Sequence, residues 1–359
     1  MKKLVILPSK KTEYFNIFLK IKELKLSNIT FIYHNKLDLK LIKKYDIIIF
    51  QKLNNTILKK VSDYKIVIIQ IDNYKTYNQL VDIFIDPFFK QIQKSVTNFV
   101  KGSFQPIQLD FNNNTELNYI LNVITLLDWD TKFWKKKICF IGPKRLTSNI
   151  IFRCNKFIRK NNPQMVQYLA NCHDANSIKI AESNNFAFKD IRITLNKKVN
   201  FFKKKIKKNI TFKKATIEDY KLIRDTAIKS YKESRYYFDD HFPLKKVKEF
   251  YSGWLKKAIL GKFDDICFLI CFKNKPVGFC TLRINNNYAQ IGLFSISEQY
   301  QNRGFSKLLL NYVENELYKL NISNLSVVTQ ARNHRALEAY QVSGFKIYRT
   351  EIWYHKWIV

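Results

Sequence analysis

The chain has 359 residues, which is long enough for two or three domains that each bury a core of their own. Its 63 lysines and arginines against 29 acidic residues give a net charge of +34, but the lysines are dispersed and outnumber the arginines 52 to 11. No apolar run approaches the roughly 18 residues needed to cross a bilayer, and the first apolar stretch has no signal-peptide cleavage pattern. We therefore expect a cytoplasmic protein with no membrane span and no nucleic-acid partner.

The six cysteines do not form a CxxC pair, and Cys267, Cys271 and Cys280 fall in apolar segments that look like strands. Such cysteines are typical of buried, reduced thiols rather than of a disulfide framework or a metal site. We therefore expect no bound metal.

Five short apolar runs occupy the first third of the chain. They are "LVILP" (4–8), "ITFIYH" (29–34), "DIIIFQ" (46–51), "IVIIQID" (66–72) and "DIFIDP" (82–87). Apolar strands that alternate with helical segments are typical of a parallel sheet covered on both faces. A nucleotide-binding sheet would normally have a Gly-rich first turn, and the first turn here has no glycine. We assign residues 1–118 to a Rossmann-like parallel α/β domain whose role the sequence leaves open.

The sequence pattern changes near residue 120 to one typical of antiparallel strands with helices between them. It changes again after the lysine cluster "FFKKKIKKN" (201–209). We interpret residues 201–210 as a solvated basic linker. A patch that meets nucleotide phosphates or anionic lipid is the alternative.

A faint internal repeat connects the parts on either side of this linker. The segment "DANSIKIAESNNF" (174–186) aligns without gaps on "NHRALEAYQVSGF" (333–345). At three aligned positions the first copy has Asp174, Ala181 and Asn185 where the second has Asn333, Tyr340 and Gly344. If the match is not a coincidence, only the second copy keeps chemically useful side chains.

The segment "QYQNRGFSKLLLNYVENELYKL" (299–320) predicts a helix with one apolar face that begins near residue 305. A buried strand, "AQIGLFSIS" (289–297), precedes it. A strand that leads through a glycine turn into a helix presents unpaired N–H groups and the positive end of the helix dipole to one point, which suits a phosphate. Gly304 permits a positive φ or the close approach of a ligand, and Arg303 adds charge. A glycine that merely turns the chain is the alternative.

Residues 301–306 resemble the Q/R-x-x-G-x-G/A pyrophosphate loop of the GNAT acetyltransferases, with a serine in the last small position. The segment 325–354 is similar to the second half of that family. It has a strand, Asn333 at a helix start, Tyr340 seven residues later, then Gly-Phe and a final hairpin.

The resemblance implies a catalytic GNAT domain over residues 211–359, with a mixed, mostly antiparallel sheet flanked by helices. For residues 119–200 it implies a degenerate GNAT-like subdomain. The cofactor would be acetyl-CoA, held by a strand that pairs with pantetheine and supplies an oxyanion N–H, by the phosphate loop and by one asparagine. The expected cofactor-binding residues are Leu293, Phe294, Ser295, Ile296, Gln301, Asn302, Arg303, Gly304, Phe305, Ser306 and Asn333.

Tyr340 is the expected catalytic residue. It lies seven residues after Asn333, roughly 10.5 Å along a helix and on nearly the same face. A phenol with an ordinary pKa near 10 stays protonated at neutral pH, so it can donate a proton to the departing thiolate of coenzyme A. A packed core tyrosine is the alternative. The general base is not identified, because Glu233 and Glu298 also fit ordinary surface charges and a water chain could serve.

The segment 234–270 is similar to the acceptor-side segment of dTDP-fucosamine acetyltransferases, and "LLDWDTKFWKKKICFI" (126–141) is similar to their opening segment. This resemblance implies that the substrate is a nucleotide-activated amino sugar, a dTDP-linked 4-amino-4,6-dideoxyhexose for a surface polysaccharide, bound near Arg235, Tyr236 and Trp254. Another amine, such as a peptide N-terminus, and a non-catalytic basic binding protein are the alternatives, and a homodimer is left open. The first 118 residues faintly resemble half of a nucleotide-sugar hydrolase of the glycosyltransferase-B type.

Overall fold

The structure is a computed structural model that describes residues 3–7, 29–33, 42, 44–51, 53, 67–71, 83–85, 122–202, 208–285 and 287–358. Contacts divide the chain into two compact units, Met1–Phe188 with Trp353–Val359 and Lys189–Ile352. The boundary between the units after Phe188 falls inside the predicted segment 119–200, within a single long strand that covers residues 187–198. The four-part division of the sequence stays a prediction.

The first unit begins with a five-stranded parallel sheet. Its strands are β1 (Lys3–Leu7), β2 (Ile29–Tyr33), β3 (Ile47–Phe50), β4 (Val67–Ile71) and β5 (Ile83–Ile85), in the order β2-β1-β3-β4-β5. All five apolar runs are therefore strands of a parallel sheet, as predicted. The connecting segments lie outside the described residues, so a Rossmann-like domain stays a prediction there.

The remainder of the first unit alternates strands and helices. The elements are β6 (Ile124–Leu126), α5 (Asp128–Trp134), β7 (Ile138–Ile141), α6 (Ser148–Asn161), β8 (Met165–Asn171) and α7 (Ala175–Ser183). Strands β6 and β7 are antiparallel, as expected, whereas β7 and β8 are parallel because α6 forms a crossover between them.

The second unit contains a mixed sheet with helices against it. Its elements are β9 (Ala187–Lys198), β10 (Ile210–Lys214), η5 (Ile217–Asp219), α8 (Tyr220–Ser230), α9 (Leu244–Ile259), β11 (Ile266–Phe272), β12 (Lys275–Asn285), β13 (Tyr288–Ile296), η6 (Glu298–Tyr300), α10 (Phe305–Lys319), β14 (Asn324–Gln330), α11 (His334–Val342) and β15 (Lys346–Trp357). The strand order is β10-β11-β12-β13-β14-β9-β15. Only β13 and β14 pair in parallel among the described registers of this unit, so the sheet is mostly antiparallel, as predicted.

The predicted final hairpin is wrong. Residues 346–357 form the single strand β15, "KIYRTEIWYHKW". This segment contains no Gly, Pro, Asn or Asp that would favour a turn, and its β-branched and aromatic residues favour a continuous strand.

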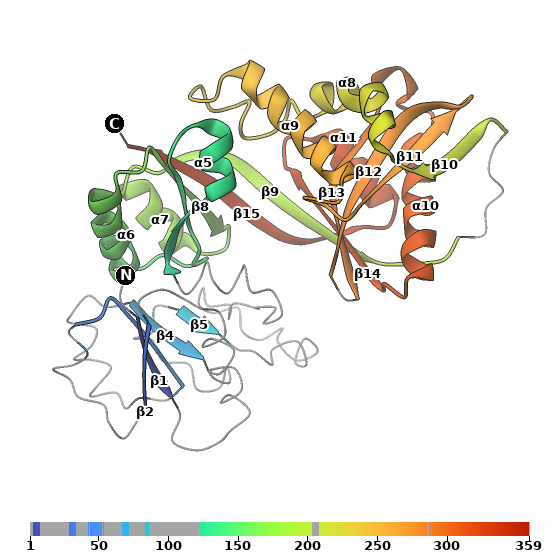
Figure 1. The fold of residues 1–359 in the computed structure, drawn as a ribbon. Helices are drawn as coiled ribbons and strands as arrows, with labels where there is room; N and C mark the ends of the chain where they lie inside the picture. Colours follow the sequence, from blue (N-terminus) through green and yellow to red (C-terminus); the bar gives the residue numbers. More distant parts are fainter. Residues whose placement is uncertain are drawn as a thin grey trace. The chain divides into compact units, whose positions relative to one another are not determined.

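The two faces of the second unit's sheet are covered by different helices (Figure 1). Ile193 and Leu195 of β9 and Ile270 of β11 share one core with Leu309 of α10. Because successive side chains of a strand point to opposite faces, Arg192 projects from the other face. Helices α8 and α9 contact strands β11–β13 there. We call the face with Ile193 and Leu195 the α10 face, and the opposite face, with Arg192, the α8 face.

No helix within the described ranges is long and apolar enough to cross a membrane. The part of the chain that the structure describes also holds no group of three His, Cys, Asp or Glu side chains arranged for a metal ion. The six cysteines are unpaired, and all but Cys172 are buried.

Candidate active site

Strand β13 loses its pairing with β14 partway along its length. The parallel register runs from Tyr288 to Ile291, whereas pairing with β12 continues to Ile296 after a shift in register. Residues 292–296 therefore have one edge without a strand partner in the described part of the chain. Such an edge can pair with an extended ligand as if the ligand were another strand.

Hydrogen bonds to β12 indicate which backbone groups face this open edge. The N–H of Ser297 donates to the carbonyl of Val277 over 2.8 Å, and the N–H of Leu293 donates to Oγ1 of Thr281 over 2.7 Å. Backbone groups of successive residues point to alternate sides of an antiparallel strand. The N–H groups of Phe294 and Ile296 therefore point to the open edge, while that of Leu293 is already occupied.

Helix α8 and the residue after it fasten the end of β13. Oγ of Ser230 lies 2.5 Å from Oγ of Ser295, and Oη of Tyr231 donates to the carbonyl of Phe294 over 3.4 Å. The Tyr231 ring stacks on Tyr251 with centroids 4.6 Å apart. No local sequence feature distinguishes Tyr231 among the 20 tyrosines, so the sequence alone does not identify this residue.

The backbone of the predicted phosphate loop is left-handed at two positions. Asn302 and Gly304 have φ values of 59° and 79°, both in the left-handed region. Helix α10 begins at Phe305 with no side-chain cap, so the first N–H groups of the helix remain available to an anion. A Cβ atom on Gly304 would meet nothing within 4 Å, which leaves space over the loop.

Other residues of the loop have distinct positions. The amide of Gln301 donates to the carbonyl of Ile296 over 2.9 Å, which ties the loop to the end of β13. Arg303 is exposed, with Cζ 5.8 Å from the ring centroid of Tyr300. Phe305 is buried in the core, and Ser306 follows it at the start of α10. Arg303 is thus the cation of the loop that a ligand can reach.

Asn333 caps helix α11. Its Oδ1 accepts a hydrogen bond from the N–H of Ala336 over 3.2 Å. Its side-chain NH₂ group makes no hydrogen bond to a described residue. One half of this amide is therefore structural and the other half can still bind a ligand.

Tyr340 lies beside the open edge of β13. Its ring centroid is 5.9 Å from Phe294 and 5.5 Å from Phe345, and the residue is 5% exposed. Burial raises the pKa of the phenol, and Cys280 adds to the shift. The hydroxyl makes no hydrogen bond to any residue that the structure describes. The phenol is therefore neutral and its proton is uncommitted.

The predicted acceptor-side residues are largely engaged with the protein. Nη2 of Arg235 donates to Oη of Tyr236 over 2.8 Å, and the buried Tyr236 ring packs against Phe250. Nε1 of Trp254 donates to Oδ2 of Asp264 over 3.0 Å. Tyr236 and Trp254 thus have clear packing roles, and the substrate role of all three residues stays a prediction.

A buried carboxylate that the sequence analysis did not select holds β13 in place. Oδ2 of Asp264 accepts a hydrogen bond from Oγ1 of Thr281 over 2.6 Å. Oγ1 of Thr281 in turn accepts a hydrogen bond from the N–H of Leu293. A Cβ atom on Gly292 would lie 2.3 Å from Oδ2 of Asp264, so the strand and the carboxylate are in close contact. In the sequence Asp264 looks like one of two ordinary surface acids before a strand.

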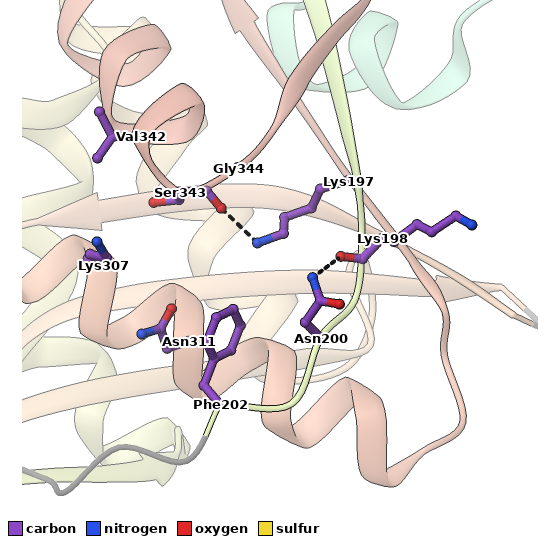
Figure 2. Close-up of a pocket in the computed structure, with 9 residues that line it drawn as sticks. All are labelled: Lys197, Lys198, Asn200, Phe202, Lys307, Asn311, Val342, Ser343 and Gly344. Atoms are coloured by element: carbon purple, nitrogen blue, oxygen red, sulfur yellow. Dashed lines mark hydrogen bonds between the residues drawn. The ribbon is translucent and has the colours of Figure 1, made fainter.

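A cavity of about 360 Å³ lies beside α10, the end of α11 and the end of β9. Lys197 crosses it and donates to the carbonyl of Ser343 and to the buried Glu314, each over 2.7 Å. Lys198 and Lys307 are also part of its lining (Figure 2). Lys307 stands directly after the loop 301–306, so this cavity and the loop are neighbours in the chain.

Residues 228–345 match a family model described as the acetyltransferase (GNAT) family. No curated protein matches the chain significantly. Among solved structures, a GCN5-related N-acetyltransferase from Sphaerobacter thermophilus is 11% identical over 65% of this chain and 76% of its own, with a TM-score of 0.47. The PaiA N-acetyltransferase from Thermoplasma acidophilum in complex with coenzyme A is 20% identical over 42% of this chain and 99% of its own, with a TM-score of 0.36.

The matched region begins in α8 and ends at Phe345, so it contains the open edge of β13, the loop 301–306 and Tyr340. These features have the order and spacing that the sequence resemblance implied. The match to the acetyltransferase (GNAT) family model therefore covers the part of the chain in which these features lie.

Proposed function

We propose that the enzyme transfers the acetyl group of acetyl-CoA directly to the amino group of a nucleotide-linked sugar, a dTDP-linked 4-amino-4,6-dideoxyhexose. The observation that carries acetyl transfer is the unpaired edge of β13 beside an uncommitted tyrosine hydroxyl. The sugar acceptor rests on the resemblance of the segment 234–270.

The donor binds along the α10 face. Its pyrophosphate occupies the uncapped start of α10, where Gly304 leaves space and Arg303 adds a positive charge. The pantetheine arm pairs with the open edge of β13 and accepts from the free half of the Asn333 amide. The cavity lined by Lys307 and Lys198 offers room and cations for the distal part of the cofactor.

The chemistry requires a neutral amine, a polarised carbonyl and a proton for the leaving group. The amine nitrogen attacks the thioester carbon, and the oxyanion that forms is stabilised by the N–H of Phe294 or Ile296. When the tetrahedral intermediate collapses, the carbon–sulfur bond breaks and the thiolate takes the proton of Tyr340. The proton that the amine loses passes to water, which returns a proton to the phenolate.

Release of coenzyme A, measured across a panel of acceptors with the full-length protein, tests this proposal. The panel contains dTDP-linked and UDP-linked amino sugars, peptides with free N-termini, and no added acceptor. We expect turnover with a dTDP-linked 4-amino sugar at least tenfold above the other amines. Turnover only with peptides would refute the sugar acceptor, and no acceptor-dependent release with any amine would refute acetyl transfer to these substrates.

A further inference from the structure

The hydroxyl group of Tyr231 lies at the open edge of β13. The N–H groups of Leu293 and Ser297 bind groups of β12, so the N–H and the C=O of Phe294 point away from β12. Oη of Tyr231 donates to that carbonyl oxygen over 3.4 Å. The hydroxyl is therefore beside the stretch 292–296, which has no strand partner on this edge within the described ranges.

Tyr231 and Tyr340 reach this edge from opposite faces of the sheet. Tyr340 belongs to the core of the α10 face, and its ring centroid lies 5.9 Å from that of Phe294. Tyr231 directly follows α8, which packs against β12 and β13 on the α8 face. The donor is proposed to bind along the α10 face, so the α8 face is left to the acceptor. Tyr231 thus stands on the side from which the acceptor arrives.

Stacking holds the Tyr231 ring in place. Its centroid lies 4.6 Å from that of Tyr251, and the two ring planes differ by 18°. Tyr251 is 6% exposed, whereas Tyr231 keeps part of its surface exposed. The preceding residue, Ser230, contacts Ser295 of β13 with 2.5 Å between the two hydroxyl oxygens. A hydroxyl fixed in this way is preorganised for a ligand, and Tyr231 is the ring of the pair that a ligand can reach.

The environment keeps the phenol of Tyr231 neutral. Burial raises its pKa, and the neighbouring Tyr340, Tyr251 and Cys280 add to the shift. Cys280 pairs with Phe294 in the register of β12 and β13, and it also raises the pKa of Tyr340. A neutral phenol both donates and accepts hydrogen bonds. With its proton directed to the carbonyl of Phe294, the Tyr231 oxygen can still accept an N–H.

The two hydroxyl groups therefore suit different parts of the reaction. The Tyr340 proton is not given to any residue that the structure describes, so it is available to a leaving thiolate. The Tyr231 proton is directed to the protein, so this hydroxyl offers its oxygen. An amine that attacks a carbonyl held by the N–H of Phe294 or Ile296 brings its own N–H groups to the same edge. The amine nitrogen is thus the donor that matches the Tyr231 oxygen.

We propose that Tyr231 binds the acceptor directly: its hydroxyl oxygen accepts one N–H of the attacking amine and so directs the nitrogen lone pair toward the thioester carbon. This inference rests on the acetyl transfer of the proposed function and holds for any primary amine, whatever carries it. The N–H that Tyr231 accepts is the one that the amide product keeps, and the other proton of the amine leaves. No bond to Tyr231 forms or breaks.

The kinetic test is Tyr231→Phe, which keeps the stacked ring and removes the hydroxyl. We expect kcat/KM for the amine that turns over fastest to fall about tenfold, because one hydrogen bond and the orientation of the nitrogen are lost. The KM for acetyl-CoA should equal that of the parent, because the pantetheine arm pairs with the backbone of β13. If the KM for acetyl-CoA rises together with the loss for the amine, Tyr231 acts by holding β13 and the proposal is overturned.

Tyr220→Phe is the matched control. Tyr220 is the first residue of α8, at the other end of the helix from Tyr231, and its ring centroid lies 5.8 Å from Nζ of Lys256. The kinetics of this variant should equal those of the parent. An equal loss in the Tyr220 and Tyr231 variants would also overturn the proposal, since phenol hydroxyls on this side would then act through the fold.

Two unreactive conjugates test the contact without turnover. In both, the sulfur of coenzyme A is joined through a CH2–C(O) bridge to the nitrogen of propylamine. One nitrogen keeps its N–H, and the other carries a methyl group instead. In calorimetric titrations of the full-length protein, we expect the preference for the N–H conjugate to be about three- to tenfold greater in the parent than in Tyr231→Phe.

The conjugates contain no sugar, so their outcome is separate from the choice of acceptor. An equal preference in the two proteins refutes the Tyr231 contact, even where an amino sugar is acetylated. If neither conjugate binds the parent, the coenzyme A site is refuted and the contact with it. If the preference depends on Tyr231 and yet no dTDP-linked amino sugar is acetylated, the proposed acceptor fails and the Tyr231 contact stands.

Discussion

Two strand–helix–strand segments of this chain have the same local geometry, yet only one is open to a ligand. They are β8-α7-β9 in the first part and β14-α11-β15 in the second. In both, a nine-residue helix leads through a left-handed residue, Asn185 or Gly344, into a twelve-residue strand. In both, the N–H of the next phenylalanine donates to the carbonyl of the aligned helical residue, over 3.1 Å to Ala181 and 3.0 Å to Tyr340.

The two copies differ in whether their polar groups are already bound. Asp174 caps α7 and binds the Ser177 N–H and hydroxyl with its two oxygens, whereas Asn333 caps α11 with one atom only. The helix before each segment shows the same contrast. Thr147 caps α6 by accepting from Ile150 over 3.3 Å, and α10 starts at Gly304 without a side-chain cap. The same strand–helix–strand geometry is thus closed by side chains in the first segment and left open in the second.

The largest effect should come from removing the hydroxyl of Tyr340, a group that the aligned Ala181 of the first segment lacks. Tyr340→Phe keeps the ring and removes an uncommitted proton donor, so turnover should fall about 10²–10⁴-fold. The stability should change by no more than ~1 kcal/mol, because no hydrogen bond of the protein is lost. Steady-state turnover at saturating substrates and a thermal melt measure the two quantities. Tyr312→Phe, in the same core, is the control, and turnover of Tyr340→Phe within threefold of the parent would return Tyr340 to a packing role.

A smaller effect should follow when the open edge of β13 is displaced. In Gly292→Ala the new Cβ collides with Asp264 and Thr281, so β13 must shift, and a misplacement of about 1 Å can cost roughly 10²-fold in rate. We expect kcat to fall about tenfold to hundredfold with the fold retained by circular dichroism. Gly253→Ala is the matched control, because its Cβ meets nothing within 4 Å in the interior of α9. That variant should gain about 0.5–1 kcal/mol of stability and keep its turnover. Equal turnover in both variants would show that the position of β13 does not matter.

Closing the phosphate loop should affect the cofactor and not the chemical step. Gly304 has a φ of 79°, which a β-branched residue does not adopt without strain. In Gly304→Val we expect the KM for acetyl-CoA to rise about tenfold, equivalent to ~1.4 kcal/mol of binding. Gly304→Asn, which tolerates a left-handed backbone, should show a smaller rise. An unchanged KM in a folded Gly304→Val protein contradicts the assignment of the loop.

The smallest effect is expected in the closed copy. Thr147→Ala removes the cap of α6 and should cost about 1 kcal/mol of stability, measured by urea denaturation. The KM for acetyl-CoA should stay at the parent value, because the start of α6 is capped by the Thr147 side chain and is not expected to bind the cofactor. A change in that KM without a loss of stability would mean that the first copy also takes part in binding the cofactor.

Much of this organisation could be predicted from local sequence. The apolar runs predict the parallel strands, the helical spacing after Gly304 predicts α10, and the resemblance places Asn333 at the start of α11 and Tyr340 within it. The groups brought together by tertiary contacts could not be predicted. Asp264 accepts a hydrogen bond from Thr281, which is 17 residues further along the chain. Arg192 forms an ion pair with Glu351 only because β9 and β15 are neighbours in one sheet. No local pattern distinguishes such residues from surface charges.

Hydrogen–deuterium exchange of the full-length protein with and without coenzyme A tests most directly that only the second copy binds the acyl donor. Amide groups that gain a ligand partner or lose their opening motions exchange more slowly. We predict slower exchange with coenzyme A in residues 293–308 and 333–345, and no change in residues 142–150 and 174–186. Protection of the α6 start, or unchanged exchange at the α10 start with saturating coenzyme A, would contradict the contrast between an open copy and a closed one.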